Sequence, residues 1–267
     1  MLYYVSHITA HALGRNEIDI TDPQSIELVI EQLKPAVIIN ASAYTAVDKA
    51  ESEQDEAYLI NATAVEYLAK AANQHGIRLL HISTDFVFDG TKNTPYKVDD
   101  QTNPINVYGA SKLAGELAIK AHCPTNSAIV RTSWVYSSHG NNFVKTMLRL
   151  MAEKDELNVV SDQIGCPTNA NSLAKYLWQL AEQDTLEPIY HYSDLGVASW
   201  YDFAVAIQSI ALEQGILSKK IVIHPIPSSD YPTPAMRPFF GLLAAIEGSR
   251  EHWITSLKQT LLLLGDE

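Results

Sequence analysis

Short apolar runs alternate with helical segments along the first 150 or so residues, and this order constrains the fold more than any other feature. The apolar runs, each four or five residues long, lie at 36–40, 79–82 and 128–131. The helical segments lie at 21–33, 56–75, 107–122 and 142–152. Strands that are joined through helices pair in parallel and are buried on both faces. The sequence therefore predicts an α/β fold, with a parallel sheet wrapped by helices.

Beyond about residue 150 the pattern changes. Short apolar runs at 189–192 and 221–223 alternate with helices at 172–182 and 199–214, and prolines become frequent from Pro225 onward. Proline-rich turns separate short elements. We therefore expect two domains, 1–150 and 151–267, with a boundary near residue 150.

Composition excludes several classes of protein. A net charge of −12 and a pI near 5.1 argue against a nucleic-acid or anionic-membrane surface, although a few local Arg or Lys side chains can hold a diphosphate. Two cysteines provide neither a disulfide framework nor a metal cluster, and no metal site is expected. No apolar stretch approaches the roughly 20 residues of a membrane span, and residues 1–7 have no basic start of a signal peptide. We expect a cytoplasmic protein.

Tyr108 and Lys112 are the most informative pair in the chain. A spacing of four residues puts both side chains on one face of a helix. An ammonium one turn away favours the phenolate, so Tyr108 is a candidate general acid/base for a carbonyl–alcohol pair. The alternative is a surface Tyr beside a solvated Lys.

A second candidate group follows the apolar run 79–82. Ser83, Thr84 and Asp85 come where that strand ends, and ligands of open α/β sheets gather at the carboxyl ends of strands. The Thr84 hydroxyl is therefore placed to bind the same oxygen that Tyr108 protonates. An ordinary strand-to-loop cap is the alternative.

Seven ordered blocks resemble the dTDP-4-dehydrorhamnose reductase family, within the extended short-chain dehydrogenases/reductases. The blocks lie at 40–51, 83–88, 108–116, 131–136, 140–143, 162–168 and 231–238. The resemblance implies a Rossmann-like dinucleotide-binding domain at 1–150 and a mainly substrate-binding domain at 151–267, with segments that return to the sheet. It also implies NADP(H) or NAD(H) as cofactor and a dTDP-sugar as ligand, and it leaves room for a homodimer.

The resemblance also assigns roles to particular residues. It makes Tyr108 the proton donor, Lys112 the group that lowers the Tyr pKa and binds the nicotinamide ribose, and Thr84 the group that orients the substrate oxygen. The implied cofactor-binding residues are Arg15, Asp19, Ile20, Ala41, Ser42, Ala43, Tyr108 and Lys112. The implied substrate-binding residues are Thr45, Val47, Thr84, Asp85 and Trp134.

Several of these assignments have a plain structural alternative. Arg15 suits either a 2′-phosphate or solvent, and the small residues 41–43 suit either a cofactor or helix–sheet packing. Asp85 suits a loop cap, and Trp134 suits the core as well as a sugar ring. Phe86 stands where the family commonly has Tyr.

The chain departs from the family at its beginning. Gly14 is the only glycine among the first 75 residues, and no Gly-rich pyrophosphate turn occurs anywhere. Residues 8–15 resemble the family's second strand, so we expect a sheet whose first strand is missing and weak binding of NADPH. Two functions follow: an NAD(P)H-dependent reductase that makes dTDP-L-rhamnose, or a non-catalytic nucleotide-binding or regulatory protein that kept the fold.

Overall fold

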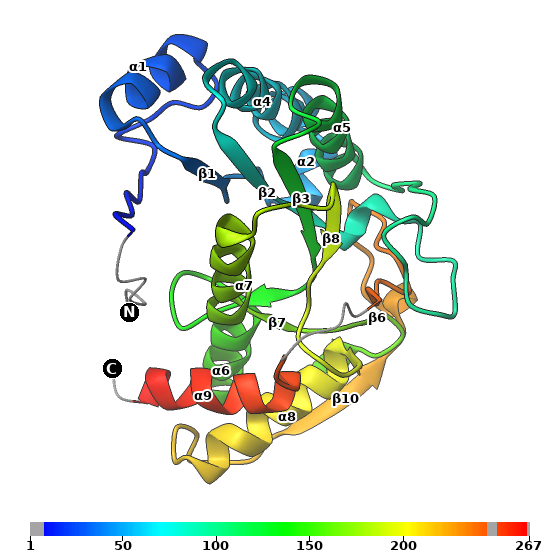
Figure 1. Cartoon of the computed structure of the whole chain (residues 1–267). Helices are drawn as coiled ribbons and strands as arrows, with labels where there is room; N and C mark the ends of the chain where they lie inside the picture. The colour runs from blue at the N-terminus through cyan, green and yellow to red at the C-terminus, as the bar shows by residue number, and fades with distance from the viewer. Residues whose placement is uncertain (1–7, 245–249, 266–267) are drawn as a thin grey trace.

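A computed structural model describes residues 8–244 and 250–265 of the chain (Figure 1). The part of the expectation that concerned residues 1–7 lies outside these ranges. In the upper half of Figure 1, helices flank a parallel sheet, and helices α6, α8 and α9 gather below it. The predicted α/β class, a parallel sheet flanked by helices, is confirmed.

The helices and strands follow one another in the predicted alternation. The α-helices are α1 (Pro23–Leu33), α2 (Val47–Ala50), α3 (Gln54–Tyr58), α4 (Ala64–His75), α5 (Val107–His122), α6 (Phe143–Glu153), α7 (Ala170–Glu182), α8 (Trp200–Glu213) and α9 (Trp253–Gly265). Three short helices of other types are η1 (Leu59–Thr63), η2 (Asp85–Val87) and η3 (Ser228–Asp230). The strands are β1 (Val37–Asn40), β2 (Arg78–Thr84), β3 (Ser127–Thr132), β4 (Val135–Tyr136), β5 (Glu156–Val160), β6 (Ile164–Gly165), β7 (Thr168–Asn169), β8 (Ile189–His191), β9 (Ala198–Ser199) and β10 (Val222–Ile226).

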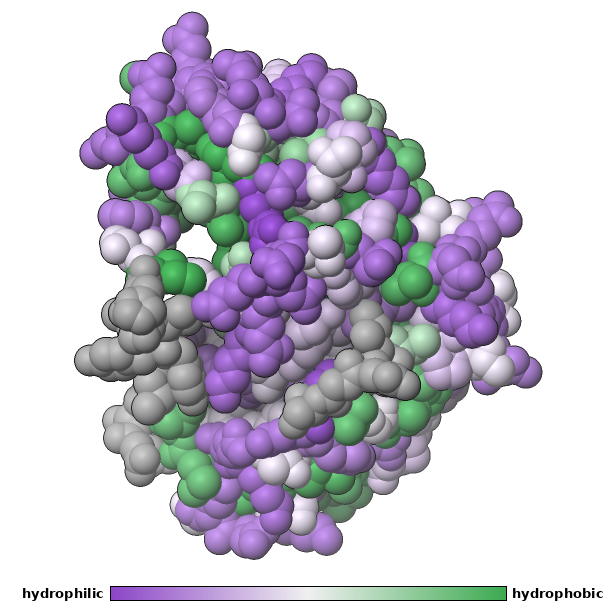
Figure 2. Space-filling model, in the orientation of Figure 1, coloured by the Kyte–Doolittle hydropathy of each residue, from purple (hydrophilic) through white to green (hydrophobic). Residues whose placement is uncertain are grey.

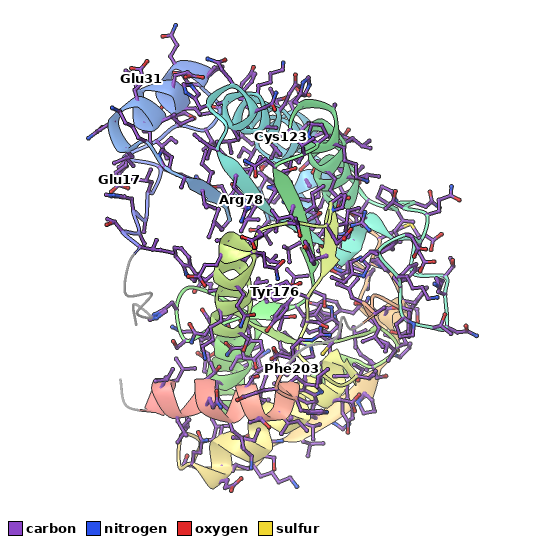
Figure 3. All side chains as sticks on the ribbon, viewed as in Figure 1. Glu17, Glu31, Arg78, Cys123, Tyr176 and Phe203 are labelled. Carbon is purple, nitrogen blue, oxygen red and sulfur yellow. The ribbon has the colours of Figure 1, made fainter. Side chains whose placement is uncertain are left out.

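The main sheet has the strand order β1-β2-β3-β8, and all neighbours are parallel. Helical layers cover both of its faces. Leu79 packs with α1, α4 and α5, whereas Leu80 packs with α7 on the other face. Successive strand residues point to opposite faces. Because both faces of β2 are covered, the adjacent residues Leu79 and Leu80 are both apolar. In Figure 3, Cys123 and Tyr176 mark these two cores, and Phe203 marks a third core among α6, α8 and α9.

Local side chains define where the helices begin. Asp22 accepts from the backbone N–H of Gln24, and Pro23 occupies the first turn of α1. Asn106 accepts from the N–H of Gly109 and starts α5 at Val107. At the far end of the sheet, Arg78 donates to the carbonyl oxygens of Ala181 and Gln183 and so satisfies the C-terminus of α7 (Figure 3).

The structure corrects two local expectations. The helix expected over 56–75 is three segments, because the π-helix η1 interrupts it. The wide turn presents the side chain of Asn61 to the backbone of Tyr44 and to Ser111. Residues 8–15, expected to form a strand, are exposed and form irregular structure and the start of a turn, and β1 is an edge strand of the described sheet.

The second half of the chain contributes to both regions of the molecule. α7 packs on the main sheet, and β8 pairs within it. The core below the sheet combines α6, α8 and α9 with β5. α6 lies across the expected boundary near residue 150, and the division into 1–150 and 151–267 stays a prediction.

We predict that Gly115→Ala destabilises the fold. A Cβ at Gly115 would lie 2.2 Å from the carbonyl oxygen of Asn61, which is backbone and cannot rotate away. Alanine favours a helix by about 1 kcal/mol, but forced overpacking costs about 1–3 kcal/mol. The melting temperature, followed by circular dichroism, should therefore fall. Gly265→Ala, where the nearest atom would be 3.4 Å away, is the control and should change it little.

Candidate active site

The carboxyl ends of β1, β2 and β3 meet at one edge of the sheet. Thr84 at the end of β2 lies opposite Thr132 in β3, and Asn40 at the end of β1 lies opposite His81. The predicted groups after β1 and β2 are therefore brought together at this edge, as expected for a parallel sheet.

Helix α5 places Tyr108 beside this edge. A Cβ at Gly109 would lie 2.1 Å from the carbonyl oxygen of Phe86, so only a glycine lets the first turn of α5 rest on η2. The Tyr108 ring meets Phe86 edge-on, with ring centroids 5.5 Å apart. Burial raises the pKa of Tyr108 to about 12, while a hydrogen bond with Thr84 acts in the opposite direction. Thr84 at the end of β2 therefore lies near Tyr108 on α5.

Lys112 lies one turn deeper and is only 2% exposed. Its Nζ donates to the Ile82 carbonyl oxygen at 2.7 Å and lies 3.2 Å from His81 Nε2. Burial lowers the pKa of Lys112 to about 8, although Glu116 raises it. Burial is the largest influence on the Tyr108 pKa and raises it. The expected effect of Lys112 on that pKa stays a prediction.

Asp85 is a buried carboxyl at the same edge. It is 3% exposed and accepts from the Thr84 hydroxyl at 3.1 Å. Burial raises the Asp85 pKa to about 7, against the effect of that hydrogen bond. Asp85, Phe86 and Trp134 also line a pocket, together with Gln163, Ile164, Trp200, Arg237, Pro238 and Gly241. The loop-cap alternative for Asp85 is therefore incomplete, since the residue also faces a pocket.

Trp134 belongs to the pocket and to the core at once. Its backbone has φ +49°, a left-handed conformation that is unfavourable for a residue with a Cβ. Its ring stacks on Trp200 with centroids 3.7 Å apart, and a Cβ at Gly165 would come within 2.9 Å of the ring. The sequence offered a sugar platform or a core Trp, and the structure combines packing with pocket lining.

The remaining cofactor-side residues lie on two segments. Ala41 and Ser42 are exposed and Ala43 is half-buried directly after β1, so this edge leaves room for a ligand. Arg15 and Asp19 are exposed before α1, and Ile20 packs against the core beneath α1 and α4. A bond from the Thr21 hydroxyl lowers the Asp19 pKa. Thr45 is exposed and Val47, half-buried, starts α2; neither lines the pocket above.

Sequence reasoning missed a buried ion pair beneath the site. Arg131 donates to both oxygens of Glu116, at 2.9 and 2.6 Å, and Ser83 donates to Glu116 as well. Arg131 also stacks on Phe88 and lies 3.5 Å from His191. The available signal was a charged residue inside an otherwise apolar strand, because such a residue needs a buried partner.

A second missed pair links the cofactor side to the pocket. Arg237, which lines the pocket, donates to both oxygens of Asp48 in α2, at 2.7 and 2.8 Å. The guanidinium lowers the pKa of Asp48. Both residues lie in blocks of the resemblance, but nothing in the sequence joined them.

Figure 2 shows that hydrophilic side chains cover much of the visible face, between scattered apolar patches. Among residues 8–244 and 250–265, no cluster of three or more His, Cys, Asp or Glu side chains has the placement to hold a metal ion. No helix in these described ranges has both the length and the apolar character to cross a membrane.

We predict that Glu116→Gln destabilises the chain strongly. Removing one partner of a buried ion pair leaves the other charge unpaired, at a cost of about 3–5 kcal/mol. The free energy of unfolding in urea should fall accordingly. Glu153→Gln, which breaks the exposed pair with Arg149 on α6, is the matched control and should cost about 0.5 kcal/mol or less. Equal losses in both variants would contradict the buried-pair argument.

We predict that Asp85→Asn stabilises the chain at alkaline pH. A buried carboxyl whose pKa is raised from 3.8 to about 7 favours folding in its protonated form. Stability therefore falls as the pH rises from about 4 to 7, and it does not recover above pH 7. The amide avoids that cost, so melting temperatures at pH 8 should rise while those at pH 4 change little. A gain that is equal at both pH values would contradict the assignment.

The chain resembles known proteins along most of its length. The family model described as the RmlD substrate binding domain matches residues 2–261. A dTDP-4-dehydrorhamnose reductase of Aggregatibacter actinomycetemcomitans is 47% identical over 232 residues, which cover 85% of this chain and 79% of that protein. The corresponding reductase of Escherichia coli (strain K12) is 45% identical over 224 residues, covering 82% and 75%.

Solved structures agree with this resemblance. A dTDP-4-dehydrorhamnose reductase from Bacillus anthracis, solved in complex with NADP, has a TM-score of 0.89 at 36% identity and covers 94% of this chain and 89% of that one. One from Clostridium acetobutylicum has a TM-score of 0.87 at 39% identity and covers 94% and 88%. The chain belongs to the dTDP-4-dehydrorhamnose reductase family.

Proposed function

We propose that this chain catalyses the NAD(P)H-dependent reduction of dTDP-4-dehydro-6-deoxy-L-mannose to dTDP-L-rhamnose. The reaction belongs to nucleotide-sugar and cell-surface polysaccharide biosynthesis. The observation that carries the proposal is the proximity of Thr84 and Tyr108 at the sheet edge, with Lys112 buried one turn away. The alternative, a non-catalytic nucleotide-binding or regulatory protein, is not favoured, because the relatives at 45–47% identity are reductases by name.

The residues at the sheet edge fit the nicotinamide half of the cofactor. Ala41 and Ser42 are small and exposed after β1, and the buried Thr132 hydroxyl at the end of β3 has no hydrogen-bond partner. Ala41, Ser42, Ala43, Tyr108 and Lys112 would hold this half of NADP(H) or NAD(H). Arg15, Asp19 and Ile20 stay predicted for the adenine half. When bound, the reduced cofactor supplies the hydride for C4 of the sugar.

Tyr108 supplies the proton in this proposal. Because burial raises its pKa to about 12, the phenol stays protonated at neutral pH and is ready to donate. Thr84, which lies close enough to act on the Tyr108 pKa, would orient the same substrate oxygen. As negative charge develops on that oxygen, the proton transfer neutralises it, which is the usual gain from general acid catalysis.

The pocket suits a deoxysugar attached to a charged group. Phe86, Trp134, Trp200 and Ile164 give it an apolar wall, which favours a ring that carries a methyl group. Arg237 also lines the pocket, and its guanidinium, which is paired with Asp48, would contact the diphosphate. We propose Asp85 and Trp134 as substrate-binding residues here, and Thr45 and Val47 stay predictions. A homodimer and a cytoplasmic location also stay predictions.

We predict that Tyr108→Phe lowers turnover by at least about 100-fold, because it removes the proton donor. Affinity for the dTDP-sugar should change little, as measured by calorimetry. Tyr58→Phe, on the exposed helix α3, removes a phenolic hydroxyl elsewhere and is the control. Near-normal turnover in Tyr108→Phe, with an active unmodified chain, would overturn the assignment.

A further inference from the structure

Trp134 has a strained backbone at the wall of the pocket. It is one of the two non-glycine residues with positive φ in the described part of the chain. Its φ of +49° is unfavourable for a residue with a Cβ, and such a conformation persists only where the surroundings enforce it. Strained residues of this kind cluster at ligand-binding sites, and Trp134 lines the pocket. The contacts that hold Trp134 therefore determine the shape of this wall.

A second indole supports the Trp134 ring. The rings of Trp134 and Trp200 lie nearly parallel, at 11°, with centroids 3.7 Å apart. Trp200 is the first residue of α8, and Ser199 and Asp202 form a capping box that fixes where this helix begins. Phe143 of α6 also contacts Trp200, with ring centroids 4.7 Å apart. The position of Trp200 is consequently set by α8 and α6, and Trp134 rests against it.

Gly165 leaves the space that the Trp134 indole fills. A Cβ at Gly165 would lie 2.9 Å from Cε2, 3.0 Å from Cζ2 and 3.1 Å from Nε1 of Trp134, which is too close unless the ring moves. The backbone of Gly165 is not left-handed, so the missing side chain is needed for space and not for conformation. Gly165 does not itself line the pocket. An effect of this position on a ligand is therefore expected to pass through Trp134.

Backbone pairing and one hydroxyl fix these three residues relative to one another. β6, which ends at Gly165, pairs antiparallel with β9, and β9 leads directly into Trp200. The Ser133 hydroxyl, one residue before Trp134, donates at 2.9 Å to the carbonyl oxygen of Cys166, one residue after Gly165. The indole therefore lies between segments that are joined by hydrogen bonds, and its surroundings enforce the strained backbone.

We propose that Gly165 and Trp200 are positioning residues that act on the substrate through Trp134. Gly165 admits the indole and Trp200 supports it, so the wall that Trp134 contributes is formed before a ligand binds. The inference rests on the proposed function, in which Trp134 contacts the sugar. A wall formed in advance spares the ligand the cost of ordering it, and this raises affinity. Gly165 and Trp200 should therefore govern binding of the dTDP-sugar and leave the chemical step at Tyr108 unaffected.

Gly165→Ala tests the proposal. The added methyl group displaces the indole, so KM for the dTDP-sugar should rise at least about 10-fold while kcat changes less than about 3-fold. In Trp134→Leu the smaller side chain leaves room for that methyl group. The double variant Gly165→Ala/Trp134→Leu should therefore have the KM of Trp134→Leu alone, because effects that pass through one contact are not additive. Gly265→Ala adds the same methyl group on α9 and should leave KM unchanged. An unchanged KM in Gly165→Ala, or additive effects in the double variant, would overturn the proposal.

A second pair of variants decides the matter if Gly165→Ala does not fold. Trp200→Phe keeps an aromatic ring against Trp134 and should retain most of the affinity for the dTDP-sugar, whereas Trp200→Ala should lose it. Stacked indoles couple their electronic transitions. The circular dichroism of the unmodified chain should therefore show a pair of bands of opposite sign, which disappears in both variants. Equal loss of affinity in Trp200→Phe and Trp200→Ala, or an unmodified chain without the paired bands, would overturn the proposal.

Binding measurements separate this proposal from the proposed function. Calorimetry with dTDP-L-rhamnose measures affinity without turnover, so the variants are comparable even in a chain that does not reduce the sugar. An inactive chain whose affinity still falls in Gly165→Ala would contradict the proposed reaction and support the positioning role. An unmodified chain that neither binds dTDP-L-rhamnose nor turns over would overturn both.

Discussion

The burial of the Lys112 amine against β2 is the constraint on which the rest of the site depends. An amine that is 2% exposed needs partners in the protein, and the sheet supplies them as the Ile82 carbonyl and His81. β1 ends at Asn40, which lies opposite His81 in β2. The Asn40 side chain contacts the His81 ring. The Tyr–Lys helix is therefore positioned by the order of two neighbouring strands, not by its own sequence alone.

Helix α5 packs closely against the short helices η1 and η2 because Gly109 and Gly115 carry no side chain. Gly109 meets the carbonyl oxygen of Phe86 in η2, and Gly115 meets that of Asn61 in η1, so both contacts limit where α5 can lie. The Glu116–Arg131 pair fastens the same helix to β3 from inside the core. Replacing a buried ion pair by apolar residues is often neutral for stability, whereas breaking it is not. The pair consequently serves to define one position of α5 rather than to add net stability.

The local sequence pattern predicted most helices and strands of the fold, but it did not predict most contacts of the candidate site. α5 spans Val107–His122 as expected, because Asn106 caps it and its apolar face is periodic. The interrupted helix around η1 escaped prediction, since the need for Asn61 at Tyr44 and Ser111 comes from distant segments. The rise of the Tyr108 pKa on burial could not be predicted for the same reason: a spacing of four residues reveals a neighbouring charge, but burial depends on segments distant in the sequence. His81 passed unnoticed within an apolar run because its partners lie 41 and 31 residues away.

The Asp48–Arg237 pair joins two segments that are far apart in the sequence and so positions the pocket, although it adds little to the free energy of unfolding. The two side chains are 41% and 23% exposed, and pairs of this kind contribute about 0–1 kcal/mol. Asp48 nevertheless also accepts from the backbone N–H of Ala235, so α2 holds the segment that bears Arg237 by three hydrogen bonds. Asn106, the cap of α5, donates to the Met236 carbonyl in the same segment. The wall of the pocket is thus attached to the helix after β1 and to the first turn of the helix that carries Tyr108. A ligand in the pocket would therefore contact a surface whose position is set by the same elements that position the acid.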